Sequence, residues 1–257
     1  MQALNLHNLI LKCVAVKDRS KWKQVIQGHF DNLFSSLDEQ KKIDPENYET
    51  VKTYLSLRIY NAQAVNQRGG IEQLVARRDL DGTFTLLMLD LPGAFTAVQK
   101  SVFALWKKDN AEVFKVAQAN INKQTVEKVT QQVDIDGSKI EISFLGNEDY
   151  AASYALDMLH NSPELVGEWG SIVAIPNKGL VDICKISKAK PLDFVKFIQR
   201  TKALVEKSFR EHPQPISDDY FWYYKGTFTK VTVLTQPNGS INVISPFGLT
   251  ELMTEKK

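Results

Sequence analysis

Apolar residues recur at the period of a helix in several segments of the chain. Between Trp22 and Phe34, for example, they fall every three or four residues and so line one face of a helix. Glu148 and Asp149 are expected to cap the helix that begins at residue 150. Pro191 opens the longest predicted helix, where a missing N–H group costs little. This period predicts helices over residues 6–14, 22–34, 98–106, 110–121, 150–159, 191–209 and 247–253.

Other segments follow the period of a strand. Residues 54–60 alternate apolar and polar side chains, which is typical of a strand with one buried face. Residues 84–91 are almost continuously apolar, so we expect a central strand that ends at Pro92-Gly93. The pair Asp136-Gly137 predicts a type I′ turn. Further strands are predicted over residues 74–78, 126–135, 139–145, 171–175, 180–186, 220–224, 227–234 and 240–244.

The order of these elements favours an α+β fold. Most of the predicted strands form antiparallel pairs, and strands and helices do not alternate regularly as they do in a doubly wound sheet. Helices lead into strand pairs about twice, with a break near Gln124. We therefore predict two α/β halves, residues 1–123 and 124–257, that are similar in arrangement but share no repeated sequence.

Composition and charge exclude several classes of protein. The formal net charge is only +2, too small for the whole molecule to attract nucleic acid or a membrane. No window approaches the roughly 18 consecutive apolar residues of a membrane-spanning helix. The first sixteen residues lack the cleavage site of a signal peptide. Cys13 and Cys184 lie among apolar neighbours, which indicates buried free thiols. We therefore expect a cytoplasmic protein without a membrane partner.

The sequence assigns no catalytic residue, cofactor or metal ligand. It contains neither a glycine-rich phosphate loop nor a G-x-S-x-G nucleophile motif. The histidines and cysteines also lack the spacing of a zinc site. A hydrolase-type enzyme stays open as an alternative only if the fold brings dispersed residues together, and the candidates are Asp90, His160 and Cys184.

An aromatic segment, residues 220–224, is the first candidate surface for a partner. In a strand, Tyr220, Trp222 and Tyr224 share one face, and their neighbours face the other way. If no helix covers that face, the three rings form an exposed patch that can bind a protein. If a helix does cover it, they belong to the core. The sequence leaves both outcomes open.

Residues 185–210 form a second candidate, because they contain eight basic and two acidic residues. Lys196 and Arg200 are the positions at which we would place contacts with an acidic protein or, as a weak alternative, with nucleic acid. A solvated helix face is the simpler explanation, because the basic residues point in several directions. Nucleic acid is therefore disfavoured as a partner.

Several short motifs, in this order, resemble one family. They are residues 89–92 (Leu-Asp-Leu-Pro), Trp106, residues 114–120 (Phe-Lys-Val-Ala-Gln-Ala-Asn), residues 150–155 (Tyr-Ala-Ala-Ser-Tyr-Ala) and residues 170–177 (Gly-Ser-Ile-Val-Ala-Ile-Pro-Asn). Across about residues 85–185 the chain resembles the bacterial YtpQ-like proteins, a family of unknown function. The arginine that usually follows the Pro-Asn pair in that family is Lys178 here. The resemblance implies a bacterial cytoplasmic α+β protein and brings no activity with it.

Taken together, these patterns predict a non-enzymatic protein-interaction or regulatory module, chaperone-like in character. Its expected partner is another protein, bound through a sheet face or edge near Trp222. Self-association stays open.

Overall fold

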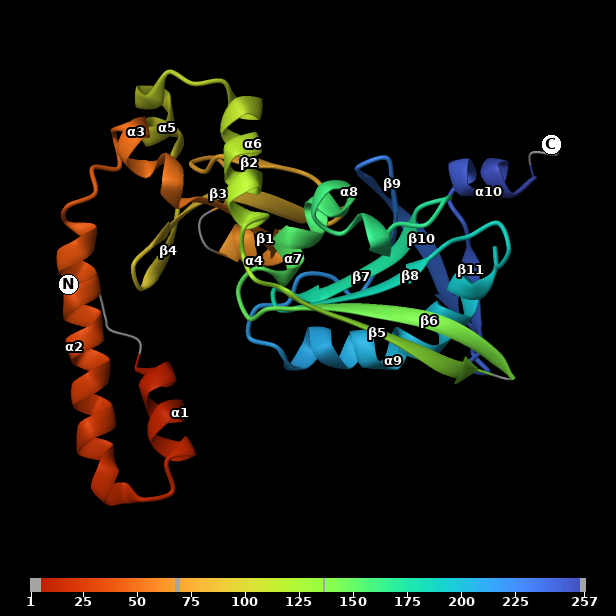
Figure 1. Ribbon diagram of the computed structural model, residues 1–257, viewed down its shortest axis with the longest axis horizontal. Coiled ribbons are helices and arrows are strands. Elements are labelled where there is room, and N and C mark those ends of the chain that lie inside the picture. The colour runs from red at the N-terminus through yellow and green to blue at the C-terminus, as the bar shows by residue number, and fades with distance from the viewer. Residues whose placement is uncertain (1–5, 68–69, 136, 255–257) are drawn as a thin grey trace.

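The computed structural model describes residues 6–67, 70–135 and 137–254, and Figure 1 labels its elements. Within these residues the strands form one four-stranded and one seven-stranded sheet, both antiparallel. Helices pack against both sheets, so the predicted α+β class is confirmed. The predicted turn at Asp136-Gly137 lies partly outside the described residues. None of the described helices is long and apolar enough to cross a membrane.

The residues up to 123 build the four-stranded sheet and the helices around it. These elements are α1 (His7–Ala15), α2 (Trp22–Gln40), α3 (Tyr48–Val51), β1 (Leu55–Asn61), α4 (Ala62–Gln67), β2 (Ala76–Arg77), β3 (Thr83–Leu91), β4 (Ala94–Ala97), α5 (Lys100–Trp106) and α6 (Asn110–Ile121). β3 pairs with β1, β2 and β4, which confirms that its apolar run is a central strand. The Asp109 side chain caps α6 by accepting a hydrogen bond from the N–H of Glu112.

The structure differs from the predictions for this sheet in two respects. Pro92 and Gly93 end β3 as expected, but the chain turns there into β4, a strand that the sequence did not indicate. The prediction that β1 has only one buried face is wrong. Ser56 and Arg58 alternate with its apolar residues and are buried as well, because other parts of the chain cover the second face.

The residues after 123 build the seven-stranded sheet, whose strand order is β11-β10-β9-β7-β8-β6-β5. Its strands are β5 (Glu127–Ile135), β6 (Ser138–Gly146), β7 (Ser171–Asn177), β8 (Leu180–Lys185), β9 (Tyr220–Tyr224), β10 (Thr227–Thr235) and β11 (Ile241–Ile244). Its helices are α7 (Ala151–Tyr154), α8 (Met158–Asn161), α9 (Asp193–Glu211) and α10 (Phe247–Thr254). The single helix predicted over residues 150–159 is therefore wrong, because a 3-10 turn (Ala155–Asp157) separates α7 from α8.

Both faces of the seven-stranded sheet are covered. On one face, side chains such as Val173 and Phe221 join residues of β1, β3, α6 and α7 in one core. On the other face, Ile172 and Trp222 belong to a second core that α9 and α10 complete, and Figure 1 shows α9 lying along the sheet. The first core thus contains residues from both sides of the predicted boundary at 123/124. The similarity of the two halves stays a prediction.

The helical hairpin, by which we mean α1, α2 and the turn between them, extends away from both sheets (Figure 1). The C-terminal end of α2 is attached to the turn between β3 and β4. There the amide Nε2 of Gln40 donates a hydrogen bond to the carbonyl oxygen of Pro92 over 2.7 Å. Gly93 has a φ of +74°, and a Cβ at this position would lie 2.9 Å from the Cβ of Ser36, so glycine is required here.

The seven-stranded sheet also buries a carboxyl group beneath α9. Asp182 of β8 is 5% exposed and lies opposite Ala174 of β7, which belongs to the second core. Burial raises the pKa of Asp182 from 3.8 to about 7. Since the folded state holds this proton more tightly than the unfolded state, stability falls as the pH rises from about 4 towards 7.

We expect Asp182→Asn to remove this pH dependence. Between pH 5 and pH 8 the free energy of unfolding of the wild type should fall by about 2 kcal/mol relative to that of the variant. Urea unfolding of both proteins at the two pH values measures the difference. Parallel pH profiles for the two proteins would show that Asp182 does not titrate in this range.

Candidate functional site

The aromatic strand lies in the core of the protein. Tyr220 is 1% exposed and Trp222 is 7% exposed, and Tyr224 is half-buried. Phe197 of α9 contacts the Tyr220 ring edge-on, with the ring centres 5.9 Å apart. Residue 248 of α10 lies so close to the indole of Trp222 that a Cβ there would be 3.3 Å from it. Because α9 and α10 cover this face, the second of the two outcomes that the sequence left open holds, and these rings pack in the core.

Part of the basic segment is engaged within the molecule. Lys202 pairs with Glu206 over 2.7 Å, and Lys185 pairs with Glu141 of β6 over the same distance. The Nζ of Lys196 donates a hydrogen bond to the Oγ of Ser138 over 2.6 Å. Arg200 is exposed on α9. These contacts fit a solvated helix face that packs on the sheet, and a role for Lys196 and Arg200 in binding stays a prediction.

The three residues considered for a dispersed catalytic site have different surroundings. Cys184 faces the second core, and burial raises the pKa of its thiol to about 12, which disfavours the reactive thiolate. The Nδ1 of His160 lies 2.5 Å from an oxygen of Asp157 beside α8, with the imidazole largely exposed. Asp90 instead accepts a hydrogen bond from the hydroxyl of Tyr150. In the described part of the chain, no three His, Cys, Asp or Glu side chains form a group that could hold a metal ion.

A polar cluster lies where the two sheets join, and two of the motifs in the family resemblance contribute to it through Asp90 and Tyr150. An oxygen of Asp149 accepts hydrogen bonds from Nη2 of Arg58 over 2.6 Å and from Nζ of Lys178 over 2.7 Å. Tyr150 follows Asp149 in the chain and contacts Asp90 of β3. The cluster therefore combines residues of β1 and β3 with residues from the loops that flank β6 and β7.

This cluster balances its own charges. The guanidinium of Arg58 lies 3.8 Å from the ring centre of Phe95, and its side chain is 8% exposed. Burial raises the pKa of Asp149, but the bonds and charges of Lys178 and Arg58 outweigh it and hold the pKa below its usual value. Burial in turn raises the pKa of Asp90. With both cations bonded to one carboxylate, the cluster is suited to joining the sheets. The helix cap expected of Glu148 and Asp149 is not formed, because no side chain caps α7. The side chain of Asn147 instead accepts hydrogen bonds from the N–H groups of Asp149 and Tyr150 in the turn before the helix.

A row of exposed apolar side chains lies on α2. Ile26, Phe34 and Leu37 are 39%, 59% and 42% exposed, and Phe30 lies between them on the same face of the helix. We call these four residues the α2 stripe. α1 leaves a row of its own exposed at Leu6, Ile10 and Val14. Within α2, no described residue is fully buried.

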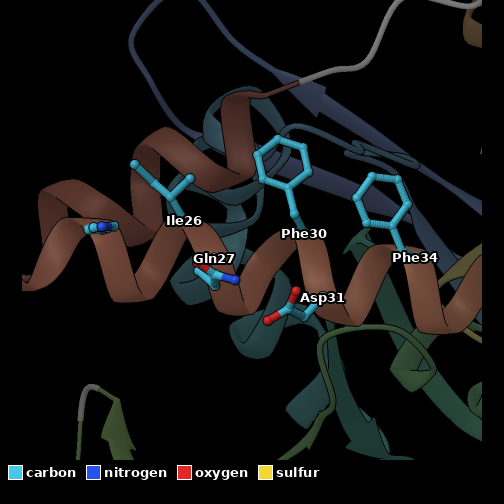
Figure 2. A pocket seen from close by; sticks show the side chains of 6 residues that line it. Ile26, Gln27, Phe30, Asp31 and Phe34 are labelled. Atoms are coloured by element: carbon cyan, nitrogen blue, oxygen red, sulfur yellow. The ribbon is translucent and has the colours of Figure 1, made fainter.

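Figure 2 shows Ile26, Phe30 and Phe34 pointing in the same direction from α2. The rings of Phe30 and Phe34 are stacked, with their centres 6.2 Å apart. Lys23, Gln27 and Asp31 complete the lining of a shallow groove of about 530 Å³ along the helix. The groove is therefore an apolar surface with a polar border, which is the composition of a protein-binding site.

The sequence predicted α2 as an amphipathic helix but not the exposure of its stripe. The signal that could have revealed it is the width of the apolar surface. Trp22, Val25 and Leu33 flank the stripe on one side, so apolar residues cover more of the helix than α1 alone can bury.

Comparison with known proteins places the chain in no family. No family model, no curated protein and no solved structure matches it. The resemblance to the YtpQ-like proteins therefore stays a prediction.

We expect Trp222→Ala to reduce stability, because Trp222 is a core residue. The indole Nε1 also donates a hydrogen bond to the carbonyl oxygen of Trp169 over 2.7 Å. Loss of the ring and of this bond should cost about 3–5 kcal/mol in the free energy of unfolding. Chemical denaturation measures this cost, with Phe34→Ala as the exposed control, for which we expect a loss of at most about 0.5 kcal/mol.

We expect Asp149→Asn to destabilise the protein by about 2–3 kcal/mol, because it leaves Arg58 and Lys178 without their shared carboxylate. The matched control is Glu49→Gln, which removes the exposed ion pair with Lys52 and should leave stability almost unchanged. Urea unfolding at pH 7 measures both. Equal small losses for the two variants would contradict a structural role for the cluster.

Proposed function

We propose that this protein is a non-enzymatic protein-interaction module that binds its partner through the α2 stripe. The observation that carries this proposal is the exposure of apolar side chains along one face of a helix that extends from the body of the protein. The surface differs from the one near Trp222 that the sequence suggested.

Burial of apolar area makes the stripe a favourable contact surface. Each large apolar side chain that leaves water on binding contributes roughly 1.5–3 kcal/mol when it is fully buried. Phe34 and Leu37 retain about half of their surface in water, so a partner that covers them gains a substantial part of this energy. An amphipathic helix that presents apolar residues at positions i, i+4, i+8 and i+11 suits a helical partner.

The charge of α2 favours a protein over an anionic partner. The helix carries one basic residue, Lys23, and three acidic residues, Asp31, Asp38 and Glu39. An anionic membrane surface or a nucleic acid would meet this acidic segment beside the apolar stripe, which is unfavourable. Two buried free cysteines, Cys13 and Cys184, support a cytoplasmic location, where thiols stay reduced.

The alternative, a hydrolase-type enzyme whose site is built from dispersed residues, has less support. Asp90, His160 and Cys184 each bond or pack with different neighbours. A nucleophile with a raised pKa needs an adjacent base, and Cys184 instead lies among apolar side chains of the second core.

The proposal is tested by placing a photoreactive benzophenone amino acid at position 34 in cells that make the protein. We expect irradiation to give covalent adducts with protein, identified by mass spectrometry, and these adducts should disappear when Ile26→Ser is added to weaken the surface. The control places the same group at Leu204, an apolar residue of α9 that is 62% exposed. Equal adduct yields at positions 34 and 204, or no protein adduct at position 34, would contradict the proposal.

A further inference from the structure

We infer that a second copy of this chain occupies the α2 stripe, with the two α2 helices antiparallel about a twofold axis near Phe30. The inference rests on the proposed function, because it names the partner of that surface. Two features support it, the spacing of the apolar residues on α2 and the distribution of charge along the hairpin.

When two copies of α2 lie antiparallel, the apolar residues of one stripe face apolar residues of the other. Ile26 and Phe34 lie four residues on either side of Phe30, so each is about 6 Å from it along the helix axis. A twofold axis at Phe30 therefore places Ile26 of one copy opposite Phe34 of the other, and the two Phe30 rings meet at the centre. The groove that Ile26, Phe30 and Phe34 line can then accept side chains of the second copy.

Charge along the hairpin selects the antiparallel arrangement. Residues 12–23, around its tip, contain five basic residues and one acidic residue. Residues 31–39 contain three acidic residues and no basic residue. In an antiparallel pair about Phe30, Lys21 and Lys23 of each hairpin lie against Asp38 and Glu39 of the other. A parallel pair would place like charges together, which is unfavourable.

One ion pair across the axis follows from this arrangement. Lys23 lies seven residues before Phe30 and Asp38 lies eight residues after it, so the two are almost level in an antiparallel pair. Both are exposed beside the stripe. Asp38 already accepts a hydrogen bond from Lys41 over 2.9 Å within its own helix, and Lys23 of the second copy would share this carboxylate. The twofold symmetry produces the pair twice.

A second copy also explains the exposed row on α1. Ile10 and Val14 are 57% and 64% exposed. Two hairpins that pack side by side form a four-helix bundle, in which apolar residues of α1 as well as α2 can be covered. A single partner helix would leave this second row in water.

The first experiment measures the molar mass of the purified full-length chain by sedimentation velocity at concentrations from about 1 to 300 μM. We expect a dimer that dissociates on dilution. Phe34→Glu should be monomeric throughout and keep the thermal midpoint of the wild type, because Phe34 is 59% exposed. Leu204→Glu, which changes a comparably exposed apolar residue on α9, should dimerise like the wild type.

Charge reversal tests the antiparallel register. Lys23→Glu and Asp38→Lys should each raise the dimer dissociation constant about tenfold, because the change acts at two symmetric contacts. The double variant restores opposite charges across the axis and should return to within about threefold of the wild type. If the dissociation constant of the double variant is raised by at least the product of the two single effects, the proposed register is wrong.

A mixed cysteine experiment tests the same register independently. Chains with Ile26→Cys and chains with Phe34→Cys, mixed and mildly oxidised, should form a disulfide-linked pair, whereas neither variant alone should do so. Linked pairs in the unmixed samples would indicate a parallel arrangement and overturn the inference. The wild type, whose Cys13 and Cys184 are buried, gives the background.

The outcomes separate this inference from the proposed function. A chain that stays monomeric at 300 μM while position 34 gives adducts with a different protein overturns the second copy alone. A monomer that gives no protein adduct but binds vesicles of phosphatidylcholine and phosphatidylglycerol overturns both. A dimer that persists in Phe34→Glu overturns the assignment of the interface to α2.

Discussion

Burial of both faces of the seven-stranded sheet is the constraint on which the rest of the structure depends. Its strands alternate apolar residues between two faces, as Ile172 and Val173 of β7 do, and neither face can remain in water without a large loss of stability. One face is covered by β1, β3, α6 and α7, and the other by α9 and α10. The covering elements come from both the beginning and the end of the chain, so the two sheets form one connected body.

The same constraint explains the polar groups trapped inside. Asp182 lies on a face that α9 must cover, so it is buried along with the apolar residues around it. Where the two sheets join, Arg58 and Lys178 are shielded from water and need a shared counter-charge, which Asp149 supplies. Two motifs of the family resemblance contribute Asp90 and Tyr150 to this junction.

The hairpin lies outside this constraint. Gln40 and Ser36 attach α2 to the turn between β3 and β4, but the stripe from Ile26 to Leu37 contacts neither sheet core. A pair of helices buries only the rows that face each other, and α1 is a short helix. Apolar residues that the body of the protein does not need thus remain exposed, which is why we propose this surface as the binding site.

Local periodicity determined most of the elements and the fold class. The strands β3, β5, β6 and β7 to β11 and the helices α2, α6, α9 and α10 could be predicted, because the spacing of apolar residues and the capping side chain of Asp109 act over a few residues. The short strand β4 and the break between α7 and α8 could not, because pairing with β3 and packing against β1 impose them from a distance. For the candidate site, a periodic row of apolar residues does not by itself distinguish a face that is buried in the core from one that stays exposed. Only the tertiary structure decided that α9 and α10 cover Trp222 while Phe34 remains exposed, because burial depends on which distant segments pack against a side chain and not on its neighbours in the sequence.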